Sequence, residues 1–480
     1  MASPLFVRND MLPPLPPPAG ERGVVKWLRE NLFSSVLNSV LTLLACLAVL
    51  WLASFILPWL AHSVWNASSL AECREKIAAS FGPEAAGPCW AVIRLRWNQF
   101  LFGLYPQAEY WRPTTAAALM MVSLSPVLYY GLRRPALNIT VTMTVLLVLA
   151  LIGLGTDWGH IVLSVAIMLA LMAVAATAPK RLLWLTLLFP FIAFFLIWGG
   201  PIWTAVGTLA GFVIFALVWQ FVQKPLGVVV GAGVGLVVAA IWWTSLQSSV
   251  TGVLAAALPW GLPYVVSDNI GGFLLAFVIG ITAISASLPI GVLLALGRRS
   301  DMPLIHSLSV GFIEFFRGVP LITVLFAANF LLLYFLPPRT NFDLILRVII
   351  VVIIFASAYI AEVIRGGLAA LPRGQYEAAD ALGLDYWQAQ RLIIMPQALK
   401  ISIPGIVSSF IGLFKDTTLV ALVGLMDPLQ GVTKIVRSDN AWKGLYWEPY
   451  IFVGGIFFLV CFSMSRYSMY LERKLKTDHR

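Results

Sequence analysis

The 480-residue sequence has few charged residues: Asp, Glu, Lys and Arg make up 11% of it, whereas hydrophobic residues make up 60%. This balance excludes an ordinary soluble domain, which could not bury so much apolar surface. Apolar runs of about 20 residues recur along the chain, and they are continuous rather than alternating. Because a backbone in lipid must satisfy its hydrogen bonds within each segment, the pattern predicts an all-α polytopic membrane protein and not a barrel.

Residues for metal, redox or phosphate chemistry are also scarce. The chain has four His and four Cys, with no CxxC and no Cys/His cluster, so we expect no metal site. It contains no G-x-x-x-x-G-K-[ST] loop to cradle phosphates, and we therefore expect no ATPase site and no enzyme activity of its own. The net charge is +10, but the basic residues gather in short loops between apolar runs, which is typical of membrane orientation and not of nucleic-acid binding.

The apolar runs predict about twelve transmembrane helices. Twelve crossings place the N- and C-termini on the same side, and basic pairs at 133–134, 180–181 and 298–299 indicate that this side is the cytoplasm. The predicted spans are 33–58, 115–131, 138–154, 160–178, 182–198, 202–222, 226–246, 272–296, 304–336, 343–369, 402–425 and 448–468.

The character of the spans changes near residue 247. Before it they are rich in Leu, Val and Ala, and after it they carry Glu, Arg, Lys and Asp. We therefore predict three regions: a Pro-rich cytoplasmic tail (1–30), an N-terminal membrane extension with an extracytoplasmic loop at 59–114 (31–247), and a five-helix functional core with a long cytoplasmic loop at 371–400 (270–475).

The long cytoplasmic loop reads as two short helices rather than a linker. Residues 375–382 are good helix formers, and Gly383 breaks that helix. Asp385 can cap a second helix, with Gln388 as its capping-box partner, and Pro396 is expected to end the run. The pair is too apolar to be freely solvated and too polar to span, so we expect it to dock onto another protein.

This loop carries a resemblance to a known family. Six positions match the EAA loop of ABC-importer permeases: Glu377, Ala378, Ala379, Gly383, Ile393 and Pro396. Over roughly 270–475, the segments "EFFRGVPL", "AYIAEVIRGGL" and "KDTTLV" resemble the polar-amino-acid branch of these permeases, and the long N-terminal half resembles the larger permease subunit of general L-amino acid importers. Two departures are Met395, where the pattern has Leu, and Val324, where many relatives have Gln.

The resemblance implies a type I ABC-importer permease core in the bacterial inner membrane, importing polar L-amino acids. Its implied partners are a second homologous permease subunit, two ATP-binding cassette subunits that hydrolyse the ATP, and a periplasmic amino-acid-binding protein. The EAA loop is then the element that docks on the ATPase. Glu377 can pair there with a basic residue of the ATPase, or it can be a solvated charge.

Charged side chains in the core allow two interpretations each. Glu314 with Arg317, and Glu362 with Arg365, stand three residues apart and can pair on one helix face. We interpret both as structural ion pairs, the alternative being that they transmit movement of the loop to the helices.

Lys415 and Asp416 stand inside a predicted span, where a charge costs roughly 3 kcal/mol. Adjacent helical residues point about 100° apart, so the two cannot simply neutralise each other. An amino-acid zwitterion offers a partner to each: Asp416 can receive the ammonium, and Lys415 or the hydroxyls of Thr417 and Thr418 can meet the carboxylate. Ion pairing with the neighbouring permease subunit is the open alternative.

Cys73 and Cys89 lie in the same extracytoplasmic loop and are expected to form a disulfide, with two free thiols as the alternative.

Three other functions fit less well. A secondary transporter needs intramembrane acidic residues in both halves, a membrane enzyme needs a polar cluster at the surface, and a structural anchor leaves the long cytoplasmic loop unexplained.

Overall fold

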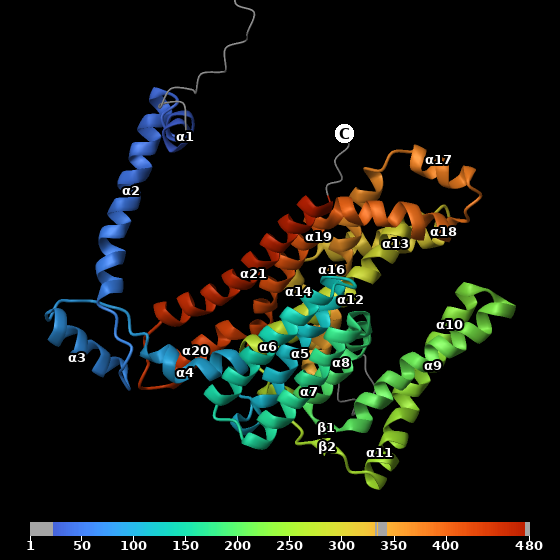
Figure 1. Cartoon of the computed structure of the whole chain (residues 1–480), viewed down its shortest axis with the longest axis horizontal. Coiled ribbons are helices and arrows are strands. Elements are labelled where there is room, and N and C mark those ends of the chain that lie inside the picture. Colours follow the sequence, from blue (N-terminus) through green and yellow to red (C-terminus); the bar gives the residue numbers. More distant parts are fainter. Residues whose placement is uncertain (1–22, 332–333, 335–342, 476–480) are drawn as a thin grey trace, which may run out of the picture. The chain divides into compact units, whose positions relative to one another are not determined.

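The computed structural model describes residues 23–331, 334 and 343–475, so most of the predicted Pro-rich tail lies outside the described residues. The described chain is almost entirely helical, apart from the paired two-residue strands β1 (Gly200–Pro201) and β2 (Gly261–Leu262). Figure 1 labels the α-helices, which are α1 (Gly23–Asn31), α2 (Val36–Ala61), α3 (Leu70–Phe81), α4 (Ala91–Phe102), α5 (Trp111–Leu128), α6 (Arg133–Gly153), α7 (Trp158–Thr177), α8 (Leu182–Trp198), α9 (Ile202–Leu226), α10 (Val228–Ile241), α11 (Gln247–Ala257), α12 (Gly272–Arg298), α13 (Pro303–Gly318), α14 (Leu321–Phe326), α16 (Leu344–Ala369), α17 (Gly374–Ala381), α18 (Tyr386–Ala389), α19 (Met395–Asp416), α20 (Pro428–Ser438) and α21 (Trp447–Leu475).

The described residues contain ten helices long and apolar enough to span a membrane, or eleven if α13 and α14 form one span. Sequence analysis predicts about twelve, and the prediction at 115–131 accounts for the difference. That segment is helical, as part of α5, but its threonines, serines and Arg112 make it less apolar than the other spans. Arg112 is fully buried, and its guanidinium donates to the carbonyls of Leu196 (2.6 Å) and Pro263 (2.8 Å). Protein atoms therefore meet the hydrogen-bonding needs of this charge.

The chain divides into two compact units, Met1–Arg94 and Leu95–Arg480. In the first unit, α2 begins after Ser35, whose hydroxyl accepts a hydrogen bond from the Asn38 backbone N–H, and none of the α2 residues is buried. A 26-residue apolar helix without buried residues is typical of a span that faces lipid.

Two groups of helices precede the core in the second unit. Helices α5 to α8 pack around buried side chains that include Val122, Leu151 and Met168. Helices α10 and α11 each pack against α9, where the indole nitrogens of Trp242 and Trp243 donate to α9 carbonyls. These groups make up most of the predicted membrane extension.

Close backbone contacts join the segment after α4 to the start of the core. Gly103 (φ +69°) and Gly272 (φ +60°) both have left-handed backbone, which glycine adopts without strain. A Cβ at Gly103 would overlap the backbone of Gly271, and one at Gly272 would overlap the Phe100 carbonyl. Only glycine allows this approach.

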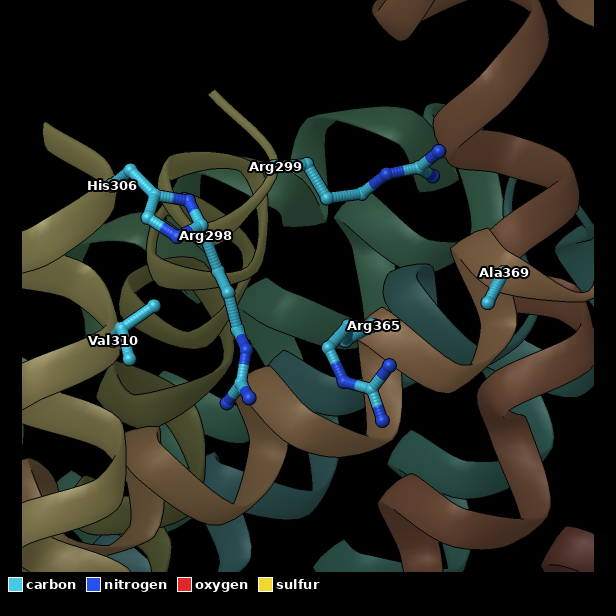
Figure 2. A pocket seen from close by; sticks show the side chains of 6 residues that line it. All are labelled: Arg298, Arg299, His306, Val310, Arg365 and Ala369. Carbon is cyan, nitrogen blue, oxygen red and sulfur yellow. The ribbon is translucent and has the colours of Figure 1, made fainter. Parts of the chain in front are cut away.

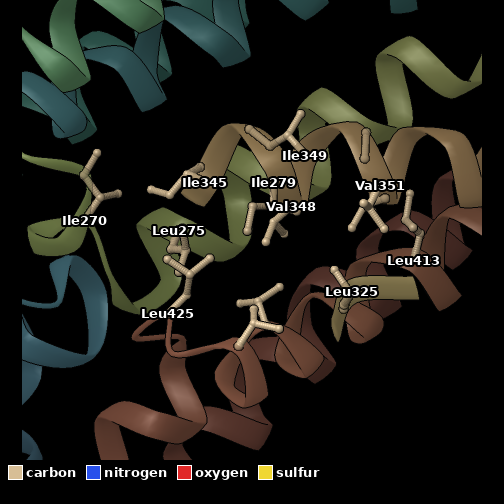
Figure 3. Close-up of a cluster of buried hydrophobic side chains, with 14 of the residues drawn as sticks. Ile270, Leu275, Ile279, Leu325, Ile345, Val348, Ile349, Val351, Leu413 and Leu425 are labelled. Atoms are coloured by element: carbon tan, nitrogen blue, oxygen red, sulfur yellow. The ribbon is translucent and has the colours of Figure 1, made fainter. Parts of the chain in front are cut away.

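The core consists of α12, α13 with α14, α16, α19 and α21. Helix α16 packs against α12 and α19, and α19 packs against α21 (Figure 1). Figure 3 shows a buried cluster between α12, α14, α16 and α19, with Leu275 and Ile279 from α12, Val348 from α16 and Leu413 from α19. Val324, where the family pattern has a polar residue, packs against the same cluster.

Sequence analysis predicts that Pro396 ends the second short helix of the cytoplasmic loop, and this is wrong. The chain continues from α18 through a π-helical turn, η7 (Gln390–Ile394), directly into α19. Pro396 occupies the first turn of α19, where a missing backbone N–H costs little because the π-turn has already changed the hydrogen-bond register. The loop is thereby joined rigidly to a transmembrane helix.

Candidate functional site: the cytoplasmic hairpin and the end of α19

The EAA-like segment forms a helical hairpin, residues 374–394, which we call the cytoplasmic hairpin after the side of the membrane that the basic residues of the sequence predict for it. Helix α17 ends before Gly383, whose φ of +71° makes the turn. Asp385 then caps α18: its carboxylate accepts from the Gln388 backbone N–H at 2.8 Å, and the Gln388 side chain accepts from the Asp385 N–H at 3.2 Å. This is the reciprocal capping box that the spacing predicts.

The inner face of the cytoplasmic hairpin is anchored to the core. Ala379 and Ile394 are buried, and Ile394 belongs to an apolar cluster built from the ends of α12, α13, α16 and α19. The Gln397 side chain donates to the Gln375 side chain at 2.8 Å, which ties α17 to α19. A displacement of the hairpin must therefore move helix ends of the core with it.

The outer face of the hairpin is exposed and partly apolar. Leu382 is 72% exposed and Trp387 63% exposed, and Leu392 is exposed beside them. Glu377 and Ala378 are also exposed. Large apolar side chains presented together with a carboxylate are typical of a surface that binds another protein. Sequence analysis missed Leu382 and Trp387, because nothing in their spacing distinguishes an exposed apolar residue from a packed one.

Of the six motif residues, two face inward. Ala379 is buried and Ile393 is partly buried, whereas Glu377, Ala378, Gly383 and Pro396 are at the surface.

Behind the hairpin lies a network of ion pairs. The Glu362 carboxylate contacts Arg365 at 2.6 Å, Arg298 at 3.3 Å and Arg317 at 3.8 Å. The Glu314 carboxylate contacts Arg298 at 2.8 Å and Arg317 at 3.9 Å. Each predicted pair thus exists, but Arg298 joins them into one network that fastens α12, α13 and α16 together. Sequence analysis missed Arg298 because it lies on another helix.

Lys415 and Asp416 stand where α19 ends and a 3₁₀ segment, η8 (Thr417–Val423), begins. Neither makes an ion pair with any residue that the structure describes. Lys415 is exposed and Asp416 is half-buried, so both charges are still available to a ligand or to another chain.

The two threonine hydroxyls that follow are engaged with the backbone. Thr417 is buried and donates to the Phe414 carbonyl at 2.7 Å, and Thr418 donates to the Lys415 carbonyl at 2.9 Å. Their protons are therefore used in this conformation, and only oxygen lone pairs remain free. This favours accepting from an ammonium over donating to a carboxylate.

Another charge within a predicted span, Arg347 near the start of α16, was not singled out from the sequence. Its guanidinium donates to the Asn329 carbonyl at 2.9 Å and to the Asn329 side chain at 3.2 Å. Its buried Nε has no hydrogen-bond partner in the described part of the chain, and no carboxylate pairs with it there. A guanidinium held only by a neutral residue retains its capacity to bind an anion.

Two further features lie outside the spans. Cys73 and Cys89 form a disulfide, with 6.1 Å between their Cα atoms. Asp427 is fully buried at the start of α20 and accepts from the backbone N–H groups of Gln430 and Leu429. Burial raises the pKa of the Asp427 carboxyl to about 6, although these two hydrogen bonds act to lower it.

Residues 287–477 match the family described as "Binding-protein-dependent transport system inner membrane component". The chain is 60% identical to the Glutamate/glutamine/aspartate/asparagine transport system permease protein BztC of Rhodobacter capsulatus, over 100% of both chains. It is 35% identical to the Inner membrane amino-acid ABC transporter permease protein YhdY of Escherichia coli, over 97% of this chain and 96% of that one.

Among solved structures, a crystal structure of an amino acid ABC transporter with histidines aligns with a TM-score of 0.38 and 29% sequence identity. It covers 42% of this chain and 91% of that one.

Proposed function

Because the chain belongs to the family of amino-acid ABC transporter permeases, we propose that its cytoplasmic hairpin couples ATP hydrolysis by a separate subunit to amino-acid import through the helices of the core. The protein is a multi-pass permease subunit of the bacterial inner membrane and is not itself an enzyme. The hairpin side of the membrane is the cytoplasm in this proposal, and both termini lie there.

One observation carries the coupling role: the cytoplasmic hairpin is fixed to the core on one face and exposed on the other. Its inner face shares an apolar cluster with α12, α13, α16 and α19. Its outer face presents Leu382, Trp387 and the Glu377 carboxylate. An element built in this way receives force from a partner and passes it to the transmembrane helices.

The transporter then needs several further parts. We infer a second homologous permease subunit, two ATP-binding cassette subunits on the hairpins, and a periplasmic binding protein that delivers the substrate. No cofactor is needed in this chain, since the partner subunits bind the ATP.

The substrate class follows from the full-length relative, whose name gives glutamate, glutamine, aspartate and asparagine. We infer the same group of acidic and amide amino acids here. We infer that the half-buried Asp416 carboxylate receives the substrate ammonium, and that the lone pairs of the two threonine hydroxyls beside it accept in the same way. A cation such as Lys415 then takes the α-carboxylate.

The coupling role is tested by co-purification of the ATPase subunit with hairpin variants. Proline at Gly383 cannot adopt a φ of +71°, so Gly383→Pro destroys the turn, and deletion of residues 377–383 removes it. We expect both variants to insert into the membrane and to lose the ATPase.

A milder pair of variants separates docking from folding. Trp387→Ala removes an exposed indole from the outer face, and Trp158→Ala removes a similarly exposed indole at the start of α7. We expect the first to weaken ATPase binding at least tenfold and the second to leave it unchanged. Undiminished binding in the Trp387→Ala and deletion variants would falsify the coupling role.

A further inference from the structure

Arg347 occupies an unfavourable position in the core. It lies in the first turn of α16, a helix long and apolar enough to span a membrane. The first turn of a helix carries partial positive charge, which destabilises a cation there. Asp343 caps this helix by accepting from the Leu346 backbone N–H at 3.1 Å, and it forms no ion pair with Arg347. No carboxylate among the described residues therefore pairs with this charge.

The Arg347 guanidinium is bonded along one edge only. Its Nη1 makes both hydrogen bonds to Asn329, whereas Nε has no acceptor and Nη2 donates to no residue that the structure describes. The N–H groups of Nε and Nη2 point along the same edge of the planar group, and this edge matches the two oxygens of a carboxylate. Arg347 thus keeps a carboxylate-binding edge without a partner in the described part of the chain.

Arg365 shows what this edge does elsewhere in the same protein. Its Nε and Nη2 both donate to the Glu362 carboxylate, at 3.0 and 2.6 Å. Figure 2 shows the Arg365 side chain near that of Arg298, which pairs with the same carboxylate. The corresponding edge of Arg347 fits a carboxylate that comes from outside the described chain.

Arg347 lies at the same level of the core as the junction of α19 and η8. Its neighbours Ile345 and Val348 pack in the cluster of Figure 3 together with Leu413, which precedes Lys415 by two residues. The other end of α16 packs in the separate apolar cluster behind the cytoplasmic hairpin. Arg347 is therefore near the end of α16 that shares its packing with the proposed substrate site.

The element that holds Arg347 also reaches this junction. Asn329 belongs to a π-helical turn, η6 (Ala327–Leu331), which continues directly from α14. Helix α14 contacts both α16 and η8. Single π-turns within helices are frequent at functional sites. Asn329 thus connects the arginine to the segment that packs on the junction.

The charges of this region match an acidic amino acid. Lys415, Asp416 and Arg347 together carry one positive charge in excess. Glutamate and aspartate carry an ammonium and two carboxylates, so they supply one opposite charge to each of these three side chains. Glutamine and asparagine replace the second carboxylate by an amide, whose carbonyl oxygen also accepts from a guanidinium.

We propose that Arg347 determines the substrate class of this permease. Its Nε–H and Nη2–H groups bind the side-chain carboxylate of acidic amino acids and the side-chain carbonyl oxygen of their amides. The Nε–H is buried in the described conformation, so the substrate reaches this edge when α16 and η6 separate during the transport cycle. This inference rests on the proposed function, from which it takes the group of imported amino acids. Charge-assisted hydrogen bonds are the stronger ones, so glutamate depends on Arg347 more than glutamine does.

The proposal is tested by the selectivity of uptake. The complete transporter and its binding protein are assembled on vesicles that contain ATP, and initial uptake of glutamate and of glutamine is measured per assembled complex. In Arg347→Gln we expect glutamate uptake to fall about tenfold and glutamine uptake about threefold or less. The ratio of the two rates is the decisive measurement, because a merely structural arginine affects both substrates equally. Equal losses, or no loss, overturn the proposal.

Two further variants complete the test. Arg347→Lys keeps the charge without the fork, and we expect glutamate uptake to fall about threefold with glutamine uptake unchanged. This variant decides the question if Arg347→Gln does not assemble, and an unchanged ratio in it overturns the proposal. The matched control is Arg466→Gln, since Arg466 is exposed in another predicted span and lies over the Phe462 ring at 6.0 Å. We expect the control to keep the wild-type ratio, and an equal shift in the control contradicts a specific role of Arg347.

The same vesicles distinguish this inference from the proposed function. ATP-dependent uptake of either amino acid by the wild-type complex tests the proposed function itself. If the wild type transports and the Arg347 variants keep its selectivity, only the inference about Arg347 fails.

Discussion

Charged side chains in the core are paired with one another in one region and unpaired in another, among the described residues. At the end that carries the cytoplasmic hairpin, Glu314 and Glu362 are each in contact with at least two arginines. At the junction of α19 and η8, Lys415 and Asp416 have no ion-pair partner among the described residues. A charge that the chain itself compensates stabilises the fold. A charge left uncompensated within a span needs water, a ligand or another chain.

This difference assigns separate roles to the two ends. The network behind the cytoplasmic hairpin holds α12, α13 and α16 as one body, so that displacement of the hairpin moves them together. In the proposed function, the charges at the junction of α19 and η8 are complemented by a zwitterionic substrate. Variants at the two ends should therefore affect different measurements.

The largest expected effect is on transport at the junction. Asp416→Asn keeps the size of the side chain and removes the charge that would receive an ammonium. We expect uptake per assembled complex to fall at least tenfold, while assembly, Tm and the basal ATPase rate stay unchanged. Uptake into vesicles containing the complete transporter measures this, with the exposed Asp268→Asn as the control.

The second-largest expected effect is a loss of stability when the ion-pair network around Glu362 is broken. Glu362→Ala leaves Arg298, Arg317 and Arg365 without their shared carboxylate, and we expect a loss of about 3 kcal/mol in the free energy of unfolding. Glu314, whose side chain is 52% exposed, is the matched control, and Glu314→Ala should cost about 1 kcal/mol or less. Thermal unfolding in detergent compares the two, and equal losses would show that the network does not depend on Glu362.

The disulfide has a more local effect. Replacing Cys73 and Cys89 by serine removes a crosslink that closes a loop of about 17 residues, worth about 3 kcal/mol to the segment it closes. We expect faster hydrogen exchange in residues 62–94 and little change in the Tm of the core. Unchanged exchange in that segment would contradict a stabilising role of the crosslink.

The smallest effect is a pH dependence at Asp427. Its folded-state pKa of about 6 lies above the ordinary value of 3.8, so the folded state binds the proton more tightly than the unfolded state. The stabilisation is complete below about pH 4 and is lost as the pH rises to about 6, by about 3 kcal/mol at most. Asp427→Asn should flatten the Tm profile between pH 4 and 6. A profile that keeps its slope in this variant would assign the titration to another group.

Local features of the cytoplasmic hairpin were predictable from the sequence, and its continuation was not. The Asp385 capping box and the Gly383 turn depend on residues three or fewer positions apart, which a sequence shows directly. Pro396 was expected to end the helix, because the π-turn that accommodates it leaves no pattern in the sequence.

Contacts between residues far apart in the sequence could not be predicted either. Spacing indicated Glu362 with Arg365, but the approach of Arg298 from α12 depends on how the helices pack. The hydroxyls of Thr417 and Thr418 were expected to face a ligand, and in the structure both donate to backbone carbonyls one turn earlier. Segment 115–131 was predicted as an apolar span. The helix that contains it also carries the buried Arg112, which donates to the carbonyls of Leu196 and Pro263, and this contact joins segments too distant in the sequence to be predicted from it.

The most direct measurement of the central claim is uptake per assembled complex in the double variant Lys415→Met with Asp416→Asn. Relative to Asp416→Asn alone, the double variant restores charge balance at the junction, so uptake should recover if the two residues only balance each other. If the two charges serve the substrate, uptake stays at least tenfold below that of the wild type although the complex assembles and hydrolyses ATP. Recovery of uptake to near the wild-type rate would contradict the assignment of this junction to the substrate.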